Sequence, residues 1–106
     1  MAEERRRAPR YQFIAEAEII EIETDTKFTA KTGDISGGGC FLDMLNPSPE
    51  GAEIRVTIVQ GDQTFTAVGR VAFVFPNVGM GVAFTRVEED QLMILHQWLE
   101  ALSTGE

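Results

Sequence analysis

The chain has 106 residues, 43% hydrophobic and 25% charged, so it is long enough for one domain with its own core. No apolar run approaches the roughly 20 residues that cross a bilayer and none follows the charged N-terminus, so we expect neither membrane insertion nor a secretory signal. Residues 1–10 hold four basic and two acidic side chains and residues 11–106 hold five and fifteen, an acidic body that argues against general nucleic-acid binding.

Residues 1–12 show no hydrophobic periodicity, and Pro9 disfavours helix at the residue before it. We predict that they form a flexible N-terminal arm, followed by a domain over residues 13–106. The arm carries an arginine cluster: Arg5, Arg6, Arg7 and Arg10. By composition alone a solvated charged tail is the favoured interpretation, and a site for a small, compact anion is the alternative.

Strand-like alternation begins at Phe13 and changes phase by one residue at Ile19/Ile20, which predicts a β-bulge of the kind that helps a sheet curl into a barrel. Residues 24–26 read as a hairpin turn into a second strand from about Lys27 to Asp34.

Four more strands follow, within residues 40–44, 53–58, 63–75 and 78–84. Gly61-Asp62 is a hairpin signal between the middle two of these. The apolar residues of the strand over 63–75 are in one phase: Phe65, Ala67, Val71, Phe73 and Phe75. Six strands without intervening helices predict an all-β antiparallel barrel or sandwich.

The period becomes helical at the C-terminal end. Thr85 to Glu88 fits a capping box, and leucines at helical spacing predict a helix over about 86–102 that closes one end of the barrel or packs on its side. A dimer contact through this helix is an alternative. His96 is expected on the helix surface, and without a second histidine or a cysteine cluster no metal site is predicted.

A glycine-rich stretch interrupts the strands at residues 33–42. In an extended segment Asp34 and Ser36 share one face, beside the three glycines at 37–39. This arrangement fits either a binding site or a turn capped by Asp and Ser. Cys40, the single cysteine of the sequence, is expected to be a small buried residue, and with no intrachain disulfide possible we expect a cytoplasmic protein.

Two motifs become informative together. Residues 5–10 fit RRxxxR, and residues 34–39 fit DxSxxG. With the strand pattern and the late strand at 79–84, the chain resembles the PilZ domain family over nearly its whole length. The resemblance implies a six-stranded antiparallel β-barrel (a split barrel) with a C-terminal α-helix that binds the bacterial second messenger cyclic di-GMP. The implied ligand-binding residues are Arg5, Arg6, Arg10, Asp34, Ser36 and Gly39, with Arg7 at a variable position.

These residue types suit the ligand chemically. Guanine offers O6 and N7 acceptors to the forked donors of arginine, and its opposite edge carries N1–H and N2–H donors. Asp34 can accept both of those donors, and Ser36 can add a contact beside it. Remaining arginines can bind phosphate, and Gly39 lets a ligand lie close to the backbone. No cofactor is expected.

The expected mechanism is a switch without chemistry: the arm orders around the ligand and changes the surface shown to a partner protein. The partner is unidentified, with motility, pilus, exopolysaccharide and transcription machinery all open, as are the ligand stoichiometry and a monomeric or dimeric state. The first alternative is a PilZ-like adaptor that binds no nucleotide. An enzyme is disfavoured because the one histidine lies far from Ser36 and Cys40 in the sequence, and a nucleic-acid-binding barrel because stacking aromatics are few.

Overall fold

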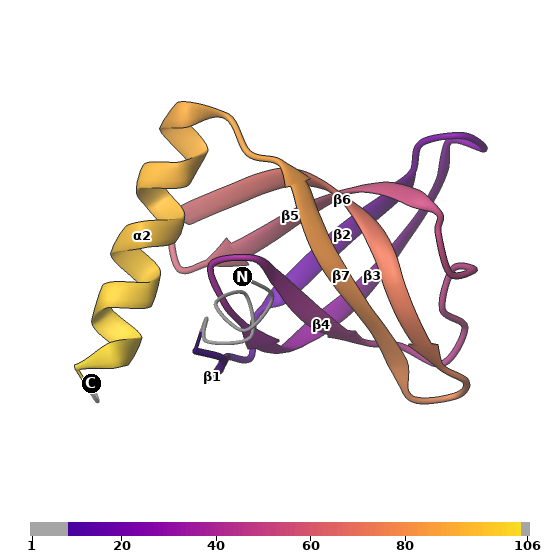
Figure 1. The fold of residues 1–106 in the computed structure, drawn as a ribbon, viewed down its shortest axis with the longest axis horizontal. Helices are drawn as coiled ribbons and strands as arrows, with labels where there is room; N and C mark the ends of the chain where they lie inside the picture. The colour runs from indigo at the N-terminus through magenta and orange to yellow at the C-terminus, as the bar shows by residue number, and fades with distance from the viewer. Residues whose placement is uncertain (1–8, 105–106) are drawn as a thin grey trace, which may run out of the picture.

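The computed structural model describes residues 9–104. Its strands are β1 (Tyr11–Gln12), β2 (Glu16–Glu21), β3 (Thr26–Ile35), β4 (Gly39–Asp43), β5 (Glu53–Gln60), β6 (Gln63–Phe75) and β7 (Gly79–Arg86), followed by helix α2 (Glu89–Ser103). The sheet order is β1-β3-β2-β5-β6-β7-β4 with antiparallel neighbours, and a further β3–β4 pairing closes the six longer strands into a barrel (Figure 1). This confirms the predicted barrel over the sandwich.

The barrel interior is filled by the inward-facing aliphatic and aromatic side chains of all six long strands. Ile19, Leu42, Ile58, Phe65 and Met80 are fully buried there. Alternate residues along these strands therefore face the core, and the residues between them face solvent.

Helix α2 runs across one end of the barrel (Figure 1). Its inward face buries Leu95 and Trp98, and the indole ring lies 5.4 Å from Phe13 and 6.0 Å from Phe65, measured between ring centroids. The indole N–H donates to Gln63 Oε1 at 2.9 Å, which satisfies its polar edge. Among residues 9–104, no helix is both long and apolar enough to span a bilayer.

The expected bulge at Ile19/Ile20 is wrong. Strand β2 keeps an unbroken register with β3 and β5 from Glu16 to Glu21, so Ile20 lies on the outer face. There it is paired with Lys27 on one side and Arg55 on the other. The aliphatic stems of these two side chains can cover an outward isoleucine, which is why a hydrophobic residue at this position need not mean a change of face.

The single phase expected for the apolar residues of β6 is wrong at the C-terminal end of the strand. Val71 pairs with Val82 and Phe73 pairs with the next residue of β7, Gly81, so Ala72 is an extra residue in β6. Because such a bulge reverses the side-chain alternation, Phe73 and Phe75 face outward and are 40% and 53% exposed.

The predicted capping box at the start of the helix is also wrong. Thr85 belongs to β7, where its hydroxyl donates to the Val68 carbonyl oxygen at 3.3 Å, and the helix begins at Glu89 after the N-cap residue Glu88. The strand continues through Thr85 because its pairing with β6 extends to Arg86. The acids in the first turn, Glu89 and Asp90, are placed as predicted.

Candidate functional site

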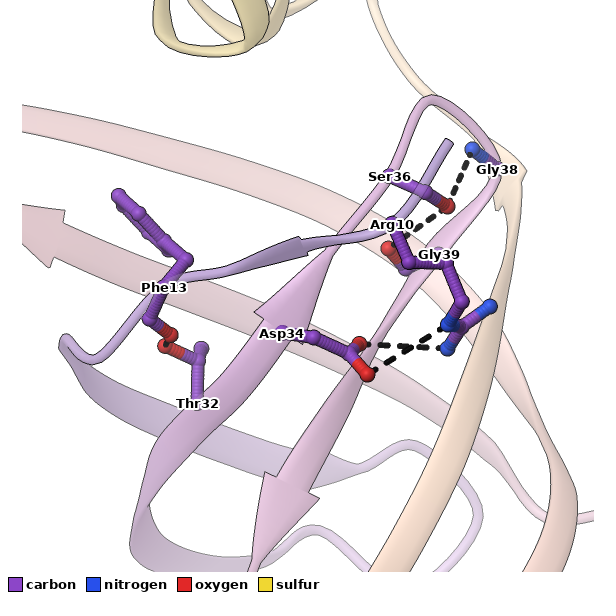
Figure 2. A network of polar contacts seen from close by, with 7 residues as sticks. All are labelled: Arg10, Phe13, Thr32, Asp34, Ser36, Gly38 and Gly39. Atoms are coloured by element: carbon purple, nitrogen blue, oxygen red, sulfur yellow. Dashed lines mark hydrogen bonds and ion pairs between the residues drawn. The ribbon is translucent and has the colours of Figure 1, made fainter. Parts of the chain in front are cut away.

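Arg10, the last residue of the first motif, meets the second motif on the outer face of the barrel, where β1 pairs with the end of β3. Gln12 lies opposite Asp34 and Tyr11 opposite Ile35, which places Arg10 beside Asp34. The guanidinium donates from Nη2 to Asp34 Oδ1 at 3.2 Å and from Nε to Oδ2 at 3.4 Å, as Figure 2 shows. The side chain of Arg10 is 50% exposed and that of Asp34 is 32% exposed, so this forked pair is open to solvent.

A β-bulge at Gly33 turns Asp34 outward. Thr32 pairs with Leu42 and Asp34 with Phe41, the next residue of β4, so Gly33 is unpaired in the β3–β4 ladder. Thr32 and Ile35 are both fully buried, whereas Asp34 lies on the outer face. Without the bulge, strict alternation would place Asp34 on the same face as Thr32, in the core.

Thr32 fixes the segment that follows Arg10, a role that the sequence analysis missed. Its buried hydroxyl accepts from the Ala15 N–H at 2.9 Å. It donates to the Phe13 carbonyl oxygen, as Figure 2 shows. These bonds satisfy two backbone groups of a segment that is not part of a regular strand. A threonine among the inward positions of β3 was the available signal.

Ser36 lies in the turn between β3 and β4, with its hydroxyl directed into that turn. Ser36 Oγ accepts from the Gly38 N–H at 3.2 Å and lies 3.4 Å from the Gly39 carbonyl oxygen, to which it donates. The residue is only 3% exposed. Asp34 and Ser36 are thus neighbours along the chain, but in this structure the carboxylate faces solvent and the hydroxyl holds the backbone of the turn (Figure 2).

Gly39 is buried where β4 meets β7. A Cβ atom at this position would overlap the main-chain carbonyl oxygen of Val82. The glycine is required here by the close approach of the neighbouring strand, and its φ angle is not positive.

Arg5, Arg6 and Arg7 lie outside the described residues. The structure therefore brings together Arg10 and Asp34, with Ser36 and Gly39 in the adjoining turn. Within the described part of the chain, no group of three or more His, Cys, Asp or Glu side chains is arranged to hold a metal ion.

Cys40 and His96 do not belong to this outer face. Cys40 is fully buried, and burial, helped by the nearby Asp34 carboxylate, raises the pKa of its thiol to about 12. His96 is exposed on α2. The site thus offers a solvent-facing carboxylate and an arginine fork, which bind polar ligand edges and anions.

Comparisons with known proteins identify the fold and the family. The family model for the PilZ domain matches residues 4–101. The PilZ domain with c-di-GMP of YcgR from Escherichia coli superposes with a TM-score of 0.76 at 14% identity, covering 95% of this chain and 93% of that one. The PilZ domain of CeSA from a cellulose-synthesizing bacterium gives 0.72 at 16% identity, with 91% and 99% covered.

The inhibitor of motility MotI/DgrA from Bacillus subtilis gives a TM-score of 0.80 at 13% identity, covering 94% of this chain but only 52% of its own. No curated protein is significantly similar in sequence. PilZ domains as a family are non-catalytic and generally bind cyclic di-GMP. With a matching family model over residues 4–101 and a six-stranded barrel closed by β3 and β4, the chain belongs to the PilZ domain family.

Proposed function

We propose that this chain is a cyclic di-GMP receptor that uses Arg5, Arg6, Arg10, Asp34, Ser36 and Gly39. The observation that carries the proposal is the forked, solvent-facing pair between Arg10, the last arginine of the first motif, and Asp34, the first residue of the second. A guanine edge with two N–H donors can replace the guanidinium at Asp34, and the freed arginine can then bind O6 and N7 or a phosphate.

The turn residues act differently in this proposal. Ser36 positions the turn through its bond to the Gly38 N–H, and Gly39 lets β4 lie against β7. Together they hold Asp34 at the edge of a short, tightly packed turn. A ligand contact from Ser36 requires its hydroxyl to rotate away from the Gly39 carbonyl oxygen.

The arm supplies the remaining arginines. Arg6 precedes Arg10 by four residues, which span at most about 14 Å when extended, so Arg5 and Arg6 are within reach of a ligand at Asp34. Because β1 is anchored opposite Asp34, binding of the anion can draw the arm over the site. The ordered arm would present a new surface to a downstream protein.

The test is isothermal titration of the chain with cyclic di-GMP, beside Arg10→Ala and Asp34→Ala. Matched controls are Lys27→Ala and Glu18→Ala, which break an exposed ion pair of 3.9 Å in the β2–β3 hairpin, far along β3 from the site. We expect losses of about 30-fold or more for the site variants, roughly 2 kcal/mol or above, and none for the controls.

A loss below about threefold in both site variants would place the ligand elsewhere. Failure of the unmodified chain to bind would favour the nucleotide-independent adaptor, for which a partner pull-down is the next experiment.

A further inference from the structure

Three phenylalanine rings cluster on the outer face of β4 and β6. Phe73 and Phe75 are exposed, and Phe41 is half-buried beside them. The ring centroids of Phe41 and Phe73 are 6.2 Å apart, those of Phe41 and Phe75 are 6.2 Å apart, and those of Phe73 and Phe75 are 5.4 Å apart. We call this cluster the phenylalanine surface. Contiguous apolar side chains that reach solvent are a common feature of binding surfaces.

This surface is in register with the Arg10–Asp34 pair. Asp34 lies opposite Phe41, Phe41 opposite Gly81, and Gly81 opposite Phe73, so the row crosses β3, β4, β7 and β6 on the outer face. Neighbouring strands lie about 4.8 Å apart, so Phe41 is one strand from Asp34, and Phe73, three strands from Asp34, lies about 14 Å from it along the sheet. A ligand held at Asp34 and extending along this row comes over the rings.

Gly81 leaves room for the Phe73 ring over β7. The tip of the Phe73 ring covers the Cα of Gly81, where a Cβ atom would overlap it. The rings of Phe41 and Phe73 are inclined to each other by only 27°. Phe73 thus lies over β7 with 40% of its surface exposed to solvent.

Resting on the proposed function, we infer that the phenylalanine surface stacks against the guanine bases of cyclic di-GMP whose polar edges are held at Asp34 and Arg10. A purine has two flat apolar faces and a polar rim, and this row offers an aromatic face beside a carboxylate and a guanidinium. A protein partner could bind the phenylalanine surface through apolar contacts alone. Such binding would not require the Arg10–Asp34 pair at the end of the row. Stacking adds affinity with little regard to base identity, so base discrimination stays with Asp34 and Arg10.

The experiment is titration of cyclic di-GMP into the full chain and three variants: Phe73→Ala, Phe41→Leu and Phe73→Trp. Val59→Ala is the matched control, because Val59 is a similarly exposed apolar residue on β5. Thermal melts of every variant establish that each is folded. We expect Phe73→Ala and Phe41→Leu to weaken binding about fivefold or more, and the control to bind normally.

Phe73→Trp adds a readout that a structural role would not produce. Its indole should retain binding, and its fluorescence should be quenched on saturation because a stacked guanine is an efficient quencher. The unmodified chain, titrated in parallel, gives the background from Trp98, which is buried on the inward face of α2.

The outcomes separate the two proposals. If the unmodified chain binds and both phenylalanine variants bind equally well without quenching in Phe73→Trp, the stacking inference is wrong and the receptor function stands. If the unmodified chain does not bind, the receptor function fails and the stacking inference fails with it.

Discussion

Gly39 lies so close to the main-chain carbonyl oxygen of Val82 that no Cβ atom fits between β4 and β7. The third glycine of the stretch is therefore set by strand packing, whereas Gly38, one residue earlier, has open space where its Cβ would be.

We predict that Gly39→Ala lowers the free energy of unfolding by about 1–3 kcal/mol, since the neighbouring backbone must move. The expected fall in Tm is roughly 5–15 °C. Gly38→Ala is the matched control and should change Tm by little, as judged by thermal melts. Equal Tm values for the two variants would mean that β4 and β7 can separate at this point without cost.

The Arg10–Asp34 pair should matter for binding far more than for stability. Both side chains are substantially exposed, so solvent screens their attraction, and a double-mutant cycle should give a coupling energy within about 1 kcal/mol in urea unfolding. The same substitutions should weaken cyclic di-GMP binding by about 30-fold or more. A large coupling energy in unfolding would indicate that the pair is a structural clamp of the arm.

Thr32 should be a stability residue of β3 with an indirect effect on the site. Thr32→Val keeps the shape but leaves the Ala15 N–H and the Phe13 carbonyl without this partner, at a cost of about 1–3 kcal/mol in unfolding. Thr29→Val, at an exposed position of the same strand, is the control. Urea titration of the two variants compares them, and an equal midpoint would show that water replaces the hydroxyl.

Cys40 should be chemically inert in the folded chain. Burial raises the pKa of its thiol from 9.0 to about 12, so at pH 8 the native protein should not react with a thiol reagent that labels it fully in urea. The sign of the pH effect follows from the raised folded-state pKa: the stabilisation is complete below pH 9 and is lost as pH rises toward 12. The free energy of unfolding of Cys40→Ala should fall less over that pH range. Rapid labelling of the thiol in the native protein would contradict its burial.

The sequence was sufficient for the barrel because most strands alternate cleanly and end at recognisable turns. The Gly61-Asp62 hairpin is formed as predicted, with Gln60 paired to Gln63 and a positive φ angle of 63° at Gly61. The contact between the motifs was not predictable in detail, because it depends on the pairing of Gln12 with Asp34 across a two-residue strand too short to give a periodic signal.

The main errors came from bulges, which a hydrophobic pattern does not locate. Ala72 in β6 reverses the direction of Phe73, and Gly33 in β3 carries Asp34 to the outer face. At Ile19/Ile20 the hydrophobic pattern changes phase, although β2 has no bulge there. A bulge is defined by the pairing of a strand with its neighbour. The residues on the outer face of the site therefore became clear only once the strand register was known.

The N-terminal arm, residues 1–12, should become protected from amide exchange when the ligand binds. If cyclic di-GMP draws Arg5 and Arg6 onto the site, amide exchange of residues 3–12 should slow at saturating ligand, most at residues 3–10, since residues 11 and 12 are already paired with β3. Residues 63–75 in β6 give the internal reference for exchange in the barrel. Arg6→Ala/Arg10→Ala should abolish the protection at the same ligand concentration. Equal exchange with and without ligand, at a concentration where titration shows saturation, would mean that binding leaves the arm unordered and that a downstream partner must recognise the ligand-filled barrel itself.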